Sequence, residues 1–210
     1  MQQLNFEKSL ALLKKYKIKF VEFKAIKTEK DLDGVKYPIV LKVFSEKIVH
    51  KTDKGGVVLD LRNKDEAIKA FKRLKKISAE GGSASGGRNV LMQPMVSQKQ
   101  EVIIGMKKDP QFGPVIMFGL GGIFVEVIKD VSFRICPVSK KDALEMIKEI
   151  KSYKVLTGLR GKQSVNINSL ADIIVKLSEL SLKEKVEEID LNPVMVSSKE
   201  AFVVDVRVMQ

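Results

Sequence analysis

The segment EIDLNPVMVSSKEAFVVDVRV, residues 188–208, contains two alternating apolar runs on either side of the polar turn SSKE. This pattern predicts a β-hairpin, because alternate residues of a strand point to the same face. Asp190 and Asn192 are two residues apart and are expected on one face, and Asp205 follows on the returning arm. Carboxylate and amide oxygens suit Mg²⁺ that also binds the phosphates of a substrate. The hairpin is therefore a candidate metal site, although a pair of surface carboxylates would leave the same pattern.

The residues before this hairpin predict a largely antiparallel sheet followed by two helices. Short apolar runs with tight Gly and Pro turns favour antiparallel pairing. These runs are NVLMQPMV, QEVIIGMKK, PVIMFG, IFVEVI and VSFRICPV. The later segments KKDALEMIKEIKSY and SLADIIVKLSELSLK show helical spacing of their apolar residues.

The first part of the chain predicts a second body. NFEKSLALLKKYK and NKDEAIKAFKRLKKISAE have the apolar spacing of amphipathic helices, and TEKDLDGVK predicts a short helix. IKFVEFKAI, YPIVLKVF and GGVVLDL predict strands. The tract GGSASGG, residues 81–87, is the one credible internal boundary. We expect an α+β fold of two lobes with mostly antiparallel sheets, an N-terminal lobe over 1–90 and a C-terminal lobe over 91–210.

Two residues of the first lobe are candidates for phosphate chemistry. His50 is the single histidine and could be a surface residue, a metal ligand or a nucleophile that carries a phosphoryl group. The metal interpretation is disfavoured because no second His or Cys lies nearby, whereas a neutral imidazole is available near pH 7. Gly55 and Gly56 would let backbone amides approach an anion closely. Lys42, inside YPIVLKVF, is either an outward-facing edge lysine or a fixed cation facing a phosphate.

Composition limits the possible classes of protein. Apolar residues make up 44% and charged residues 30%, which is typical of a globular chain. No apolar run approaches the roughly 18 residues of a spanning helix, and MQQLNFEKSL lacks the pattern of a signal peptide. The single cysteine, Cys136, can form no internal disulfide, so we expect a reducing, cytoplasmic location. The net charge of +12 favours anionic partners such as nucleotide phosphates, coenzyme A, nucleic acid or an acidic subunit.

Two common nucleotide-binding motifs are excluded. FGLGGIF, residues 118–124, is followed by an alternating run instead of the helix that a dinucleotide motif needs. No GKS or GKT occurs, so the chain has no P-loop.

Four ordered blocks together resemble a known family. They are YPIVLKVFSEKIVHKTDKGGVVLDL, QPMVSQKQEVIIGMKKDPQFGPVIMFGLGGIFVEVIKDVSFRICPVS, LTGLRGK, and EIDLNPVMV with FVVDVRV. Over nearly the entire chain this order resembles the ATP-grasp superfamily. Within it, the blocks are most similar to the β subunits of ADP-forming acetyl-CoA synthetases (acetate–CoA ligases), relatives of the succinyl-CoA synthetase β subunit. The resemblance implies an ATP-grasp fold whose two lobes enclose a nucleotide cleft.

The resemblance also implies a set of site residues. Those for ATP or ADP are Lys42 at the phosphates, the glycine pair Gly55 and Gly56, the hinge residues Gln93, Met95 and Val96, Glu101 at the ribose, and Arg134 at the γ-phosphate. Asn192 and Asp205 would bind Mg²⁺, with Asp190 in support. His50 would be the catalytic residue that relays a phosphoryl group to ADP.

The implied reaction needs a second subunit. The family forms ATP from ADP and phosphate as acyl-CoA is cleaved, and this chain has no CoA-binding motif. We expect an α subunit that binds CoA and forms the acyl phosphate, in an α2β2 assembly. Two alternatives stay open: another ATP-grasp carboxylate ligase that works through an acyl phosphate, and a basic nucleic-acid-binding protein. The aromatic content of 6% is low for single-strand binding.

Overall fold

The computed structural model describes residues 1–43, 55–80, 90–96, 100–122, 129–158 and 163–210. The chain divides into two compact units. One consists of residues 1–20 together with 98–210, and the other of residues 21–97. We call them the C-terminal unit and the N-terminal unit. In the described part of the chain, no helix is long and apolar enough to cross a membrane.

The N-terminal unit is a four-stranded antiparallel sheet with one helix packed on it. The strands are β1 (Lys24–Ile26), β2 (Ile39–Val43), β3 (Val57–Leu61) and β4 (Val90–Pro94), in the order β1-β4-β2-β3. A 3-10 turn, η1 (Glu29–Leu32), follows β1. Helix α2 (Lys64–Glu80) buries Phe71 and Leu74 against Leu41 and Val43 of β2. These helix residues are three apart, so they lie on one stripe that faces the sheet.

The C-terminal unit is built on a six-stranded antiparallel sheet. Its strands are β5 (Gln100–Asp109), β6 (Gly113–Leu120), β7 (Val131–Ile135), β8 (Glu188–Val196), β9 (Ala201–Val203) and β10 (Val206–Met209). The order is β10-β8-β5-β6-β7, and β9 pairs with β8. The predicted antiparallel sheet and the closing hairpin are therefore confirmed. The predicted strand at 123–128 lies outside the described residues, as does the 81–87 tract.

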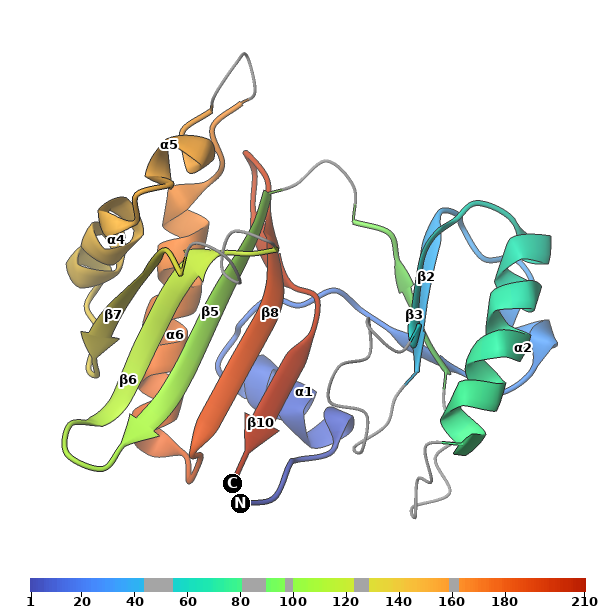
Figure 1. Cartoon of the computed structure of the whole chain (residues 1–210), viewed down its shortest axis with the longest axis horizontal. Helices are drawn as coiled ribbons and strands as arrows, with labels where there is room; N and C mark the ends of the chain where they lie inside the picture. The colour runs from blue at the N-terminus through green and yellow to red at the C-terminus, as the bar shows by residue number, and fades with distance from the viewer. Residues whose placement is uncertain (44–54, 81–89, 97–99, 123–128, 159–162) are drawn as a thin grey trace. The chain divides into compact units, whose positions relative to one another are not determined.

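Helices cover one face of this sheet. They are α1 (Phe6–Lys15), α4 (Lys140–Glu149), α5 (Tyr153–Leu156) and α6 (Ile167–Lys183). Figure 1 shows α4, α5 and α6 on the same side of the strands. Alternate strand residues such as Ile104, Ile116, Ile189 and Val208 are buried beneath the helices. The residues between them lie on the opposite face, which we call the open face because no described helix packs on it.

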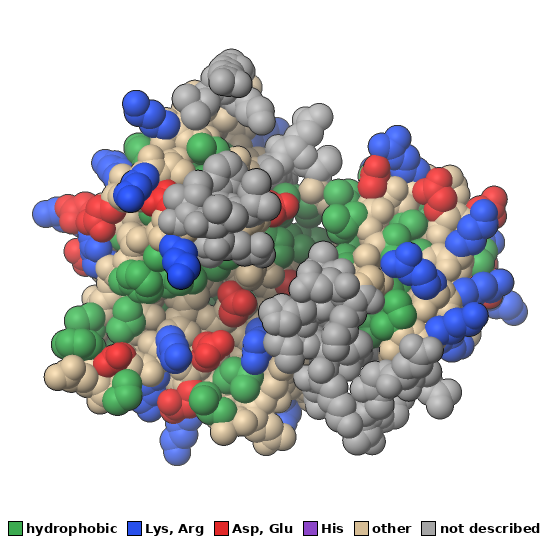
Figure 2. Space-filling view, viewed as in Figure 1, with side chains coloured by type: hydrophobic (Ala, Val, Ile, Leu, Met, Phe, Trp, Pro, Cys, Tyr) green, Lys and Arg blue, Asp and Glu red, His purple; other side chains and the backbone are tan. Residues whose placement is uncertain are grey.

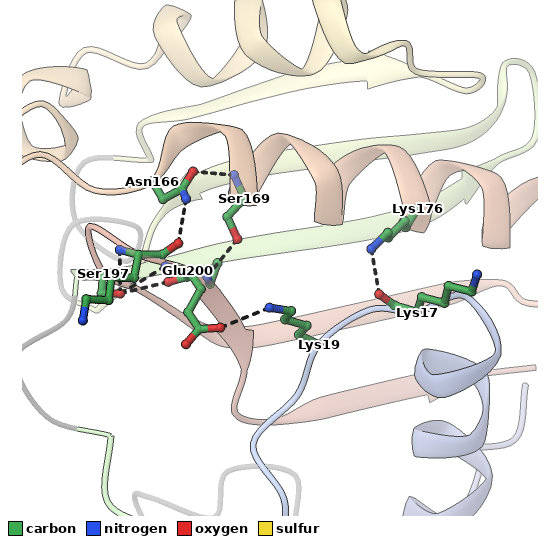
Figure 3. A network of polar contacts seen from close by, with 9 residues as sticks. Lys17, Lys19, Asn166, Ser169, Lys176, Ser197 and Glu200 are labelled. Atoms are coloured by element: carbon green, nitrogen blue, oxygen red, sulfur yellow. Dashed lines mark hydrogen bonds and ion pairs between the residues drawn. The ribbon is translucent and has the colours of Figure 1, made fainter.

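Residues 1–20 belong with the C-terminal unit, which differs from the predicted division at 90. Lys176 on α6 donates from Nζ to the Lys17 carbonyl at 2.7 Å, and Lys19 pairs with Glu200 at 3.1 Å (Figure 3). The Val203 N–H donates to the Lys19 carbonyl at 2.9 Å. The apolar stripe of α1 predicted a buried helix, but a stripe alone does not say which sheet it covers. The N-terminal unit extends to residue 97, beyond the predicted boundary at 90, because β4 pairs with both β1 and β2.

Candidate functional site

The C-terminal hairpin contains a bulge at the predicted metal ligands. Val102 and Ile104 of β5 pair with Val194 and Leu191 of β8, so β8 has one extra residue there. The Asn192 N–H donates to the Asp205 carbonyl at 3.2 Å, and the Val204 N–H donates to the Pro193 carbonyl at 2.9 Å. The returning arm breaks between β9 and β10 at the same place. Asn192 and Asp205 are therefore neighbours where the ladder is irregular, a common feature near active sites.

Asp190 lies on the open face beside this bulge. Its pKa is raised to about 6, first by burial and then by repulsion from Glu188 and Asp205, while Arg207 opposes the shift. A cation bound next to Asp190 would favour the ionised form of its carboxylate. Among the described residues, no three His, Cys, Asp or Glu side chains gather as a metal site. A magnesium site here therefore depends on the Asn192 amide as well as the two carboxylates, and this oxygen-only donor set fits Mg²⁺.

Glu101 lies at the start of β5, next to a glycine turn. The Gly121 N–H donates to the Glu101 carbonyl at 2.9 Å. A Cβ at Gly121 would lie 3.0 Å from the Glu101 Cβ, and one at Gly122 would lie 3.9 Å from Oε2. The two glycines of FGLGG thus make room for Glu101. Its exposed side chain is two residues from Ile103 and four from Gly105, so it is on the open face with Asp190.

Arg134 lies on the other face of the same sheet. It pairs across the strands with the buried Ile116, and its Nη1 donates to Glu149 of α4 at 2.9 Å. A second bond joins Nη2 to the same carboxylate, and this pairing raises the pKa of Arg134. The structure does not bring Arg134 together with Asp190, Asn192 and Asp205. Strand alternation could have shown that Arg134 shares a face with Ser132, but not that helices cover that face.

The N-terminal unit carries a second group of predicted residues. Lys42 is on the interior strand β2 and only 4% exposed. The interpretation of Lys42 as an outward-facing lysine on an edge strand is therefore excluded. Its neighbours in the ladder are Val57 and Leu91, while Gln93 pairs with the adjacent Val40. Lys42 and Gln93 are thus diagonal neighbours on the face opposite α2. The Gln93 side chain is buried, and its Nε2 donates to the Val21 carbonyl at 3.3 Å.

The glycine pair and the hinge flank these two residues. The Val43 N–H donates to the Gly56 carbonyl at 2.8 Å, and Arg73 of α2 donates to the Gly55 carbonyl at 3.0 Å. Gly55 has φ +64°, a conformation that favours glycine. After Gln93, the Met95 N–H bonds to the Pro38 carbonyl at 3.0 Å, and Met95 and Val96 are half-buried. His50 lies outside the described residues.

Sequence reasoning missed Arg207. It lies on β10, directly across from Asp190, and is half-buried on the open face. Its spacing of two residues from Asp205 in VVDVRV was the available signal. Lys42 and Gln93 therefore lie on the face of their sheet opposite α2. Asp190, Glu101 and Arg207 lie on the open face of the other sheet, and Arg134 lies on its helix-covered face.

Comparison with known proteins gives consistent matches over nearly the whole chain. A model of the ATP-grasp domain family matches residues 1–209. The chain is 45% identical to the β subunit of ADP-forming acetate–CoA ligase I of Pyrococcus furiosus, over 94% of this chain and 88% of that protein.

Two solved structures of acetyl-coenzyme A synthetase 1 from Ca. Korarchaeum cryptofilum are also similar. One, with coenzyme A, Ca-AMPCP and HgCl⁺, has a TM-score of 0.88 and 36% identity, covering 99% of this chain and 93% of that one. The other contains coenzyme A and Mg-AMPPCP, and its phosphohistidine segment points towards the nucleotide-binding site. It has a TM-score of 0.84 and 37% identity, covering 99% and 92% of the two chains.

Proposed function

This chain belongs to the ATP-grasp domain family, and on that premise we propose that it is the nucleotide-binding β subunit of an ADP-forming acyl-CoA (acetyl-CoA) synthetase. Such an enzyme is an acid–thiol ligase that forms ATP from ADP and phosphate as acyl-CoA is cleaved. The observation that carries the proposal is the 45% identity to an acetate–CoA ligase β subunit over 94% of this chain and 88% of that protein. The match therefore covers most of both chains.

Each unit, taken by itself, contains residues that are proposed to bind the nucleotide. In the N-terminal unit, the buried Lys42 would supply a fixed cation for phosphate, near the glycine pair Gly55 and Gly56. Gln93 and the half-buried Met95 and Val96 follow on β4 and the connection after it. In the C-terminal unit, Glu101 is on the open face and suits a ribose hydroxyl.

The metal would be held by Asn192 and Asp205, with Asp190 beside them. Asn192 and Asp205 are joined by a backbone hydrogen bond at the bulge, and the pKa of Asp190 is raised by burial and by repulsion from Glu188 and Asp205. A related structure contains Mg-AMPPCP, which supports Mg²⁺ as the ion. Bound Mg²⁺ would neutralise charge on the nucleotide phosphates.

His50 would carry the phosphoryl group. Its bond from imidazole nitrogen to phosphorus breaks as an oxygen of the ADP β-phosphate bonds to that phosphorus, and the nitrogen regains a proton. This transfer depends mainly on placement and charge neutralisation, which Lys42 and the metal would supply. The related structure with Mg-AMPPCP has a phosphohistidine segment that points towards its nucleotide-binding site, which supports this role for a histidine.

A partner subunit would complete the enzyme. The relatives named as β subunits imply an α subunit, which would bind CoA and form the acyl phosphate. The α2β2 stoichiometry and the cytoplasmic location stay predictions.

The test mixes this chain with its α subunit and follows ATP formation from ADP and phosphate that depends on acyl-CoA. We expect ATP formation by the wild type and at least a ~1,000-fold loss in His50→Asn, as is typical when a covalent carrier is removed. The dissociation constant for Mg-ADP should stay the same in this variant, which controls for folding and binding. Full activity of His50→Asn would instead favour an ATP-grasp ligase that needs no histidine.

A further inference from the structure

One row of residues crosses the open face of the six-stranded sheet. Arg207 pairs with Asp190, Asp190 with Gly105, Gly105 with Met117, and Met117 with Phe133. Figure 2 shows this face, on which hydrophobic and charged side chains are both present. The row is charged at the β10 and β8 end and apolar at the β6 and β7 end. Gly105 contributes no side chain beside Asp190, and the Met117 side chain packs over it, with Cε 3.4 Å from the position of a Cβ.

Arg207 lies at the charged end of this row and has a buried donor without an acceptor. Its Nε is buried without a hydrogen-bond partner. Within the described part of the chain, no hydrogen bond and no ion pair to this guanidinium is found. A guanidinium has five donors in a planar fork that matches phosphate and carboxylate oxygens, and burying donors without acceptors costs free energy. An acceptor from a ligand would remove that cost.

The surroundings of Arg207 indicate which ligand it would bind. Asp190 is directly across from it, and Asp205 precedes it by two residues, on the arm that meets Asn192 at the bulge. An arginine with proposed metal ligands on both sides suits an anion that the metal also binds, which is a phosphate. In the adjacent row, Glu188 pairs with the apolar Met209 on one side and with Lys107 on the other.

We propose that Arg207 binds the phosphate that is transferred between histidine and nucleotide, the role first predicted for Arg134. The inference rests on the proposed function and names a specific phosphate contact within it. The two arginines form a natural comparison, since both are half-buried on the same sheet but lie on opposite faces. Arg134 already has a hydrogen-bonded carboxylate in Glu149, while Arg207 interacts with Asp190 only through its charge, and its buried Nε has no hydrogen-bond partner among the described residues.

The experiment compares Arg207→Gln and Arg207→Lys with Arg134→Gln in the enzyme assembled with its α subunit. Dissociation constants for Mg-ADP and Mg-AMPPCP are measured on each variant, together with kcat and KM for ADP. We expect Arg207→Gln to weaken Mg-AMPPCP about 10- to 100-fold, as the loss of a charge-assisted hydrogen bond predicts, and Mg-ADP less than about threefold. Its kcat should fall, and Arg207→Lys should recover part of both losses. Arg134→Gln should leave both dissociation constants unchanged.

Three outcomes would overturn the inference. Arg207→Gln could bind Mg-AMPPCP as the wild type does, or lose Mg-ADP and Mg-AMPPCP equally with a lower melting temperature, which would indicate a structural role. Arg134→Gln could show the selective loss instead. In all three outcomes the wild type still binds nucleotide and forms ATP. Failure of the proposed function is distinguishable, because the wild type would then do neither.

Discussion

At the scale of single residues, carboxylates removed from water are used in two different ways. Asp190 is destabilised as an anion, because burial and the neighbouring Glu188 and Asp205 raise its pKa. Asp130 is stabilised as an anion. Burial opposes its ionisation, but hydrogen bonds from the Ser152 hydroxyl and from the Ser152 and Lys151 amides lower the pKa overall. The first arrangement suits binding of a cation, and the second fixes the chain at the start of α5.

Asp130→Asn should therefore destabilise the protein in a pH-dependent way. The folded pKa of Asp130 lies below its ordinary value of 3.8, so its contribution is present above that pH and is lost as the pH falls through the lower, folded pKa. We expect a loss of about 1–3 kcal/mol at pH 7, the usual cost of breaking a buried charged network. Denaturant unfolding of both proteins at pH 7 and pH 3 measures it. A difference that did not shrink at pH 3 would contradict this account.

Gly121 is a second residue with a measurable role. A Cβ there would lie 3.0 Å from the Cβ and 3.2 Å from the carbonyl carbon of Glu101, so Gly121→Ala must displace the β5 backbone. We expect about 1–3 kcal/mol of destabilisation, typical of overpacking, and weaker binding of Mg-ADP. Gly113→Ala is the control, since Gly113 has φ +73° and no atom within 4 Å. It should cost about 1 kcal/mol without changing the Mg-ADP dissociation constant. Equal binding by both variants would argue against a role for Glu101 at the nucleotide.

At the scale of elements, local sequence signals fix where helices start. Ser139 accepts a hydrogen bond from the Asp142 N–H, and the Asp142 carboxylate accepts from the Ser139 N–H at 3.0 Å, a reciprocal capping box at α4. We expect Ser139→Ala to cost about 1 kcal/mol, or roughly 2–4 °C in Tm for a chain of this size. Thermal unfolding measures this, and Ser139→Thr, which keeps the hydroxyl, should change little. A Tm drop in both variants would show that packing matters more than the cap.

The elements were more predictable than their contacts. The alternation in EIDLNPVMV and VSFRI correctly indicated strands, because it depends only on neighbouring residues. The extra residue of β8 at Asn192–Pro193 could not be predicted, because a bulge is defined by the pairing partner. The location of Arg134 on the helix-covered face could not be predicted for a related reason. Alternation groups residues by face, but only tertiary packing decides which face the helices cover.

At the scale of the whole molecule, the chain order and the compact units do not coincide. The C-terminal unit combines residues 1–20 with residues 98–210. Leu13 of α1 is fully buried, so it contributes to a core whose other members mostly come from residues 98–210. A helix at one end of the sequence thus stabilises a sheet formed near the other end.

Leu13→Ala should consequently weaken the C-terminal unit. We expect a loss of about 2–5 kcal/mol, as for other large-to-small changes in a core. Hydrogen exchange should accelerate at amides of β8 and β10, which belong to the same unit as α1, and stay unchanged at β2 and β4. Leu32→Ala, a fully buried residue of the N-terminal unit, is the matched control and should show the opposite pattern. Faster exchange at β2 in Leu13→Ala would contradict the division of the chain.

Gln2 and Gln210 are held together by two backbone hydrogen bonds. The Gln2 N–H donates to the Gln210 carbonyl at 2.5 Å, and the Gln210 N–H returns a bond to the Gln2 carbonyl at 2.9 Å. A short peptide could join them, and one new pair of ends could be opened either near residue 20 or near residue 98. Circular permutation of this kind would turn the discontinuous unit into one uninterrupted stretch, which would shorten the loop that the unfolded chain must close. The coding sequence for residues 21–97 could then be removed or exchanged as one continuous segment.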